Sequence, residues 1–255
     1  DEYFCVAIDL PGHGQSPLTP FDSWERAVDG IVSVAEQLGI EKFHLVGYSM
    51  GARFAMAVMA YACERLASSV LISGFPGYKR ELARIQRREV DERLAEHIKV
   101  YGLDAFMDAW YQMGMFRSLH WHPGLLERLR ARRIHRDQNA VAEALSIFSP
   151  GNMPFWGDLL ADAQVSVMYM AGEIDDKYCG ILQQLMADFS HIHGLIIPAC
   201  SHAIHLERPD IVAEEIAHWV TGILFWELWH FELEDELLVE VEDELQSKEI
   251  LPARR

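Results

Sequence analysis

The sequence has 255 residues, half of them hydrophobic, and a formal net charge of −17 at pH 7. This length and composition suit one α/β domain with a large core and exclude an intrinsically disordered chain. The acidic balance argues against nucleic-acid binding, and no run of about 18 uncharged apolar residues predicts a membrane span.

Strands and helices are expected to alternate along most of the chain. The expected strands are 3–8, 43–46, 69–72, 165–171 and 194–197, and the expected helices are 23–38, 50–63, 181–189 and 209–220. This alternation predicts a mostly parallel sheet with helices on both faces. Because the chain opens with Asp1 directly before a strand-like segment, we expect its natural N-terminus to lie upstream.

The alternation stops between Tyr78 and Trp156, where every pattern is helical. We interpret residues 79–156 as a helical cap inserted into a core formed by 1–78 and 157–224, with an acidic extension at 225–255. In that extension an amphipathic helix, an added edge strand and the start of another domain stay open. Alternation at 239–242 favours a strand locally.

Positive charge is concentrated in the predicted cap. Residues 79–136 hold 13 Lys/Arg and 8 Asp/Glu, whereas the rest of the chain holds 9 and 31. Two interpretations stay open: solvated helix faces, or a pocket for a multiply anionic small molecule whose carboxylates bind forked arginine side chains.

The four cysteines show neither a CxxC pair nor a metal-ligand spacing. We therefore expect reduced thiols in a cytoplasm-like compartment and predict no metal site.

A nucleophile is predicted at Ser49, in the motif Gly47-Tyr-Ser-Met-Gly51. A predicted strand precedes this motif and a predicted helix follows it, which is the context of a nucleophile elbow. The serine backbone is expected to be strained there, with a glycine on either side that allows strand and helix to approach closely. The backbone N–H of Met50 is the expected oxyanion donor.

A serine nucleophile needs a histidine to accept its proton and a carboxylate to orient that histidine. The loop after the fourth strand supplies Asp175, with Asp176 and then Glu173 as weaker candidates. The loop after the fifth strand supplies His202, preferred over His205 because it lies nearer the strand end. Loops at the carboxyl ends of parallel strands share one edge of the sheet, so the three side chains are expected to meet.

Six segments carry a more specific resemblance: DLPGHGQS, GYSMGAR, SGFPG, AFMDAWYQMGMFRSL, GEIDDKY and SHAIHLERP. Together they resemble the 2-succinyl-6-hydroxy-2,4-cyclohexadiene-1-carboxylate synthases of menaquinone and phylloquinone synthesis, which have the α/β-hydrolase fold. The resemblance runs from about residue 3 to 220. It implies a cytoplasmic enzyme, or a plastid one in a photosynthetic eukaryote.

The resemblance implies a lyase reaction without a cofactor. The family removes a proton from 2-succinyl-5-enolpyruvyl-6-hydroxy-3-cyclohexene-1-carboxylate and expels pyruvate, with the Ser-His-Asp triad as base. The partner is then an anionic small-molecule substrate, not a nucleic acid or a membrane. The motif positions that match the family's substrate-binding residues are Tyr48, Arg53, Arg84, Trp110, Tyr111 and, from the range 130–136, Arg133.

Family members also begin with two or three further strands and a His-Gly loop that donates a second oxyanion N–H, and neither is in this sequence. Two alternatives therefore stay open. One is a C–C bond hydrolase or carboxylesterase of the same fold, and the other is an inactive fragment or non-catalytic domain.

Overall fold

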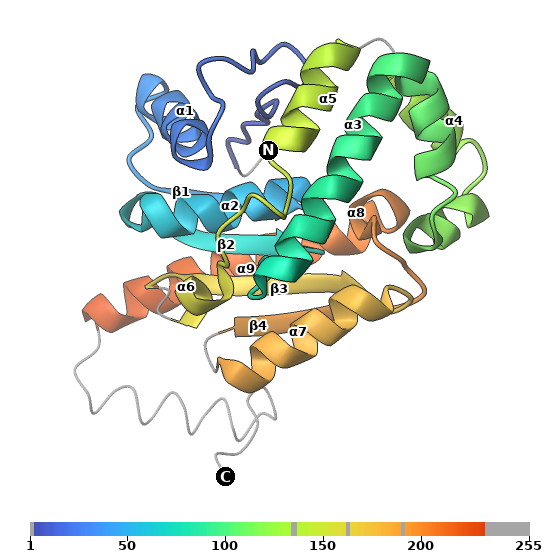
Figure 1. Ribbon diagram of the computed structural model, residues 1–255. Helices are drawn as coiled ribbons and strands as arrows, with labels where there is room; N and C mark the ends of the chain where they lie inside the picture. Colours follow the sequence, from blue (N-terminus) through green and yellow to red (C-terminus); the bar gives the residue numbers. More distant parts are fainter. Residues whose placement is uncertain (1–2, 134–136, 162–163, 190–191, 233–255) are drawn as a thin grey trace. The chain divides into compact units, whose positions relative to one another are not determined.

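A parallel sheet forms the centre of the protein. The computed structural model describes residues 3–133, 137–161, 164–189 and 192–232. Within these ranges the sheet has four strands, paired in chain order (Figure 1): β1 (Phe43–Tyr48), β2 (Leu66–Ile72), β3 (Ser166–Gly172) and β4 (Ile192–Ile197). The predicted α/β class is confirmed, and these four strands match predicted ones with ends shifted by a few residues.

The strand predicted at residues 3–8 is wrong. This segment has no regular secondary structure, and its apolar side chains are exposed, Phe4 by 77%. β1 is an edge strand of the described sheet, and the segment does not pair with it. An apolar run without a neighbouring strand lacks partners for its backbone N–H and C=O groups, and local sequence does not reveal that lack.

Helices α2 (Met50–Tyr61) and α7 (Asp176–Asp188) pack against the strands of the sheet, and α1 (Trp24–Gln37) packs on α2. Helix α1 begins after Ser23, whose side chain accepts the N–H of Arg26, and α2 follows β1 directly. Helix α7 begins five residues before its predicted start at Ile181, because its first two residues, Asp176 and Lys177, are charged and do not continue the apolar periodicity.

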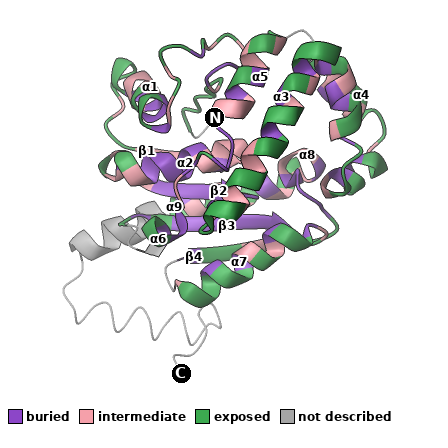
Figure 2. Ribbon diagram, in the orientation of Figure 1, coloured by how far each residue is buried: buried purple, intermediate pink, exposed green. Residues whose placement is uncertain are grey.

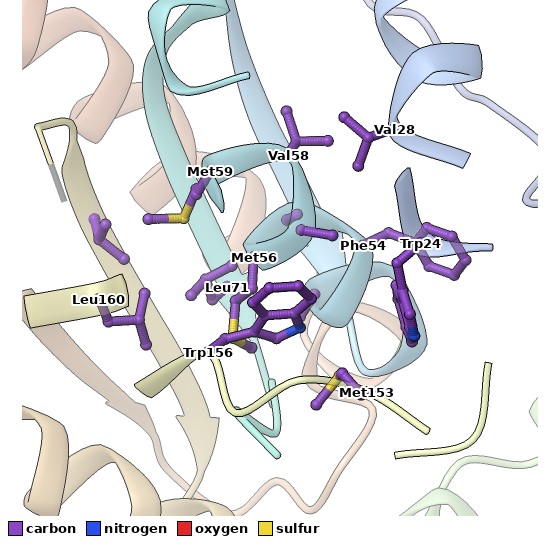
Figure 3. Close-up of a cluster of buried hydrophobic side chains, with 14 of the residues drawn as sticks. Trp24, Val28, Phe54, Met56, Val58, Met59, Leu71, Met153, Trp156 and Leu160 are labelled. Carbon is purple, nitrogen blue, oxygen red and sulfur yellow. The ribbon is translucent and has the colours of Figure 1, made fainter. Parts of the chain in front are cut away.

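Aromatic side chains join α1 and α2 to the chain that returns from the helical insertion. The ring of Trp24 lies 4.9 Å from that of Phe54, 5.2 Å from Phe148 and 6.4 Å from Trp156. Figure 3 shows Trp24, Phe54 and Trp156 of this cluster, with Met56 and Leu71 beside Trp156. Core truncations of this kind cost about 3–5 kcal/mol, so the cluster fixes α2, and with it Ser49, on the sheet.

The segment between β2 and β3 is helical, as predicted, and its described residues contain no strand. The elements between β2 and β3 are α3 (Glu81–Trp110), η2 (Gly114–Trp121), α4 (Leu125–Arg133), α5 (Gln138–Ile147) and α6 (Gly157–Ala161). A short 3-10 turn, η1 (Cys63–Arg65), lies before β2 and outside this insertion. Helix α3 bends at Gly102, where φ is 83°. Figure 2 shows that α3 exposes one side along its length, whereas β2 and β3 are buried. The boundaries of core and cap stay predictions.

The chain divides into two compact units, residues 1–212 and 213–255. After α8 (Ile204–Glu207), helix α9 (Pro209–Glu232) begins in the first unit and continues into the second, well beyond the predicted end at residue 220. Of the predicted acidic extension at 225–255, residues 225–232 lie in α9, and the rest, including the strand predicted at 239–242, falls outside the described residues. No helix in the described ranges has the length and apolarity needed to cross a membrane.

Candidate active site

Ser49 lies at the sharp turn between β1 and α2. Its φ of 50° and ψ of −102° are strained for a residue with a side chain, and its N–H donates to Ile72 O at 2.8 Å. A Cβ on Gly47 would lie 2.4 Å from Gly51 O, so that position requires glycine. A Cβ on Gly51 would meet nothing within 4 Å, so the prediction that both glycines permit close packing is right for Gly47 only.

Asp175 and His202 lie in the loops after β3 and β4, and both side chains reach Ser49. His202 Nε2 is 2.9 Å from Ser49 Oγ, and His202 Nδ1 is 2.8 Å from Asp175 Oδ2. Since a carboxylate only accepts hydrogen bonds, Nδ1 carries the proton and Nε2 accepts from the serine hydroxyl. The structure therefore brings together the three residues that the sequence selects.

The weaker candidates lie elsewhere. Glu173 accepts the backbone N–H of Ala199 at 2.9 Å, which ties together the loops after β3 and β4. Asp176 is exposed in the first turn of α7. The ring of His205 packs 4.2 Å from that of Tyr48.

The backbone of His202 is held from two sides. Its N–H donates to Met115 O of η2 at 3.0 Å, and its carbonyl accepts from Ser73 Oγ, just after β2, also at 3.0 Å. The rings of Tyr48, Tyr178 and Phe116 surround the imidazole, with centroids 5.3, 4.6 and 5.7 Å away. The histidine is fully buried. Its orientation is therefore fixed in a largely apolar surrounding.

Arg53 lies one helical turn beyond Ser49. Its Nη1 donates to Phe148 O at 2.6 Å. Burial lowers the pKa of Arg53 to about 10, and Arg87 lowers it further, whereas Tyr178 and Asp91 raise it. The guanidinium remains charged at neutral pH. Among the described contacts it has no carboxylate within salt-bridge distance.

Arg87 and Lys177 lie in the same electrostatic neighbourhood, and the sequence analysis missed both. Arg87 binds the buried carboxylate of Asp91 through Nε and Nη2, each at 2.8 Å. The Lys177 ammonium lies over the rings of Phe75 and Tyr178, at 4.7 and 4.9 Å. Lys177 is exposed as a whole residue, but partial burial of its ammonium group lowers its pKa, and Arg87 and Arg53 lower it further, whereas Asp175 raises it.

We call Arg53, Arg87 and Lys177 the cationic cluster. Burial raises the pKa of Tyr178 to about 12, an effect that Asp175 reinforces and the two arginines oppose, so this phenol stays neutral beside the cluster. Two signals in the sequence pointed to the missed residues. Arg87 has an acid four residues later on the same helix face, and Lys177 follows Asp175 by two positions.

Arg84 makes different contacts. Its Nε donates to Gly151 O at 3.2 Å, and its Nη1 is 3.5 Å from Glu81. Arg88 donates to the same carbonyl at 2.8 Å and pairs with Glu81 at 2.9 Å. The substrate-binding role that the sequence predicts for Arg84 stays a prediction, and no contact links it to the cationic cluster among the described residues.

Trp110 is the last residue of α3, and Tyr111 follows it. The Trp110 ring stacks on Phe106 at 5.4 Å, and Tyr111 is buried with its carbonyl oxygen 3.0 Å from His120 Nε2.

Met50, the predicted oxyanion donor, is the first residue of α2, so its N–H has no acceptor within the helix.

For the predicted arginine within residues 130–136, the structure gives a partial answer. Arg133 ends α4, and its side chain lies outside the described part of the structure. Arg130, at the start of that range, is paired with both Asp104 and Asp108.

Comparisons with known proteins identify the family of this chain. The model of the alpha/beta hydrolase family matches residues 1–215. The chain is 31% identical to 2-succinyl-6-hydroxy-2,4-cyclohexadiene-1-carboxylate synthase from Salmonella typhimurium over 210 residues, which cover 82% of this chain and 81% of that protein. It is 32% identical to the chloroplastic protein PHYLLO from Arabidopsis thaliana over 236 residues, 86% of this chain but 14% of that protein.

Among solved structures, MenH from S. aureus superimposes with a TM-score of 0.77 at 27% identity, covering 87% of this chain and 83% of that chain. The chain therefore belongs to the alpha/beta hydrolase family, among relatives named 2-succinyl-6-hydroxy-2,4-cyclohexadiene-1-carboxylate synthase.

Proposed function

We propose that this protein is a lyase that releases pyruvate from 2-succinyl-5-enolpyruvyl-6-hydroxy-3-cyclohexene-1-carboxylate. The product is 2-succinyl-6-hydroxy-2,4-cyclohexadiene-1-carboxylate. One observation carries the proposal: a serine–histidine–carboxylate chain lies beside cationic side chains that their own neighbours do not fully neutralise.

The names of substrate and product define the bonds that change. The ring double bond at position 3 becomes a diene at positions 2 and 4, and the enolpyruvyl group at position 5 is lost. A proton must therefore leave C2, the electron pairs shift to C2=C3 and C4=C5, and the C5–O bond breaks. The leaving enolate of pyruvate then takes up a proton to give the ketone, which balances the reaction without a cofactor.

His202 and Ser49 are the groups suited to remove that proton. The C2 proton is acidified because the succinyl carbonyl is attached to C2. Nε2 of His202 is the unprotonated ring nitrogen, and the Ser49 hydroxyl that donates to it can relay or orient the proton transfer. Asp175 holds the imidazole in the required tautomer and stabilises the imidazolium that forms.

Proton removal places negative charge on the succinyl carbonyl oxygen. The backbone N–H of Met50, at the start of α2, is a donor without an intrahelical acceptor, next to Ser49. A donor in such a position typically contributes on the order of 100- to 1000-fold in rate. We assign Met50 N–H to the developing enolate.

The cationic cluster suits the charge of this substrate, which bears carboxylates on the ring, on the succinyl chain and on the enolpyruvyl group. Arg53 and Lys177 contact no carboxylate within salt-bridge distance in the described structure, while Arg87 is paired with Asp91. A charged guanidinium or ammonium in a partly desolvated site binds carboxylate strongly. Tyr48, Trp110 and Tyr111 stay proposed substrate contacts, and Arg84 is replaced by Arg87 in this proposal.

The test is pyruvate release from the cyclohexene substrate, measured with lactate dehydrogenase and NADH, with p-nitrophenyl acetate hydrolysis as the comparison. Wild-type protein should release pyruvate, and Ser49→Ala and His202→Ala should reduce kcat by at least about 10⁴-fold while remaining folded. Rapid ester hydrolysis without pyruvate release would support an esterase instead. Absence of both activities, with no fluorophosphonate labelling of Ser49, would support a non-catalytic domain.

A further inference from the structure

A buried carboxylate lies close to the histidine loop without touching the proposed catalytic groups. The side chain of Glu207, at the end of α8, is fully buried. A buried charge is costly unless it is hydrogen-bonded, so its partners show what it stabilises. The hydrogen bonds to Glu207 Oε1 come from Ser201, the residue directly before His202, whereas Oε2 has no hydrogen-bond partner in the described structure and lies near His122.

Ser201 is bonded to Glu207 on one side and to Ser118 of η2 on the other. Ser201 N–H lies 3.2 Å from Glu207 Oε1 and 2.9 Å from Ser118 Oγ, and Ser201 Oγ lies 3.3 Å from Glu207 Oε1. The hydroxyl oxygens of Ser118 and Ser201 are 2.5 Å apart. Both serines are fully buried.

The carboxylate fixes the direction of every bond in this group. Because an ionised carboxylate only accepts, the Ser201 hydroxyl donates to Glu207, and the Ser118 hydroxyl donates to Ser201 Oγ. Ser118 Oγ is then free to accept the Ser201 N–H. Buried hydroxyl groups linked in this way form one cooperative unit whose members restrict each other's rotation.

This unit attaches the histidine loop to the helical insertion at two successive peptide groups. Ser201 N–H meets Ser118 Oγ, and His202 N–H meets Met115 O, three residues earlier in η2. The same segment places the Phe116 ring against the imidazole, and His122, just after η2, lies with Nε2 3.8 Å from Glu207 Oε2. The insertion therefore contacts the histidine through its backbone as well as through its ring.

We propose that Glu207 and Ser118 are positioning residues for His202, because they hold the Ser201–His202 peptide against η2 and so set the direction in which Nε2 points toward Ser49. This rests on the proposed use of His202 as the base. It predicts that the reaction depends on contacts between η2 and the histidine loop even where those contacts touch no substrate. A shift of about 1 Å in a catalytic group can cost on the order of 100-fold in rate.

The test compares Ser118→Ala, Glu207→Gln and Glu207→Ala with a matched control, Ser68→Ala. Ser68 is an equally buried serine in β2, whose hydroxyl is 2.8 Å from His44 Nδ1, away from the site. The first readout is the second-order rate of Ser49 labelling by a fluorophosphonate, which needs the histidine but not the proposed substrate. The second is the kcat and KM of pyruvate release, and thermal unfolding is recorded for each variant.

Ser118→Ala should slow labelling and lower kcat on the order of tenfold, with KM unchanged, and Ser68→Ala should leave both at the wild-type level. Glu207→Gln should retain much of the rate, because the amide oxygen still accepts from Ser201, whereas Glu207→Ala should lose as much as Ser118→Ala or more. Folded Ser118→Ala protein that labels at the wild-type rate, or that changes only KM, overturns the proposal. Wild-type protein that labels but releases no pyruvate overturns the proposed function instead, and labelling still tests the positioning role.

Discussion

Two sets of cationic side chains in this protein differ in how far carboxylates of the protein pair with them. The cationic cluster of Arg53, Arg87 and Lys177 lies beside the proposed base, and two of its members contact no carboxylate within salt-bridge distance in the described structure. The outer arginines, by which we mean Arg84, Arg88 and Arg130, each pair with Glu81 or with Asp104 and Asp108.

Positive charge in a sequence therefore does not identify an anion site by itself. Some of the basic residues in 79–136 make structural contacts instead. Arg84 and Arg88 both donate to the carbonyl of Gly151 and so fix α3 to the returning chain. What distinguishes the cluster is that part of its charge has no internal partner. The comparison can be sharpened by substitutions in each set.

The largest effect is expected for Arg87→Ala. It removes a guanidinium from the cluster and leaves the fully buried Asp91 carboxylate without its ion-pair partner, with the Ser149 hydroxyl still donating to it, so the free energy of unfolding should fall by about 3–5 kcal/mol in addition to a rise in KM. Denaturant unfolding and pyruvate kinetics measure the two effects. Arg87→Ala combined with Asp91→Asn should recover most of the stability but not the KM, and recovery of both would show that Arg87 is structural.

Arg53→Ala is expected to have the next largest effect. Loss of a charge-assisted hydrogen bond to a substrate carboxylate, worth about 1.5–3 kcal/mol, lowers kcat/KM on the order of 10- to 100-fold. The lost bond to Phe148 O should cost about 1 kcal/mol of stability, so the variant should remain folded. A destabilised variant with wild-type kcat/KM would remove Arg53 from the cluster.

Lys177 gives a pH dependence of defined sign. Burial, Arg87 and Arg53 lower the pKa of its ammonium group, so it loses its charge at a lower pH than an ordinary lysine. The charged form binds the anionic substrate, and kcat/KM should therefore decline as pH rises through this lowered pKa. Lys177→Arg should move that decline to higher pH, because arginine stays charged, and an unchanged alkaline limb would argue against a role for Lys177 in binding.

The smallest effect is expected for the outer arginines. Arg88→Ala and Arg130→Ala should leave kcat/KM within about twofold of wild type, because their charges are satisfied by neighbouring carboxylates. Steady-state pyruvate release measures this. A large rise in KM for Arg130→Ala would extend the anion site to α4 and weaken the distinction between the two sets.

The placement of Ser49, Asp175 and His202 could be predicted because each lies in a loop directly after a strand. The order of strands along the chain brings those loops to one edge of the sheet. The elbow also has a local signature, although only Gly47 meets the backbone closely enough to require glycine.

The cationic residues could not be ranked in the same way. Helix α3 carries arginines at 84, 87, 88 and 93, and Arg80 directly precedes it. Which of them faces the site depends on how the helix packs. Similarly, the apolar run at 3–8 resembles a strand, but strand formation depends on a neighbour that local sequence does not show. Tertiary context decides both.

The most direct test separates charge recognition from chemistry in one pair of proteins. The two double variants are Arg53→Ala/Lys177→Met and Arg88→Ala/Arg130→Ala. Each is assayed for pyruvate release and for the reactivity of Ser49. That reactivity is measured by fluorophosphonate labelling and, if the wild-type protein hydrolyses a neutral p-nitrophenyl ester, also by that hydrolysis. The first double variant should lose kcat/KM for pyruvate release while Ser49 keeps its reactivity, and the second should match wild type in both. Equal losses in the two double variants, or parallel loss of pyruvate release and Ser49 reactivity in the first, would contradict an anion-selecting cluster beside a separate base.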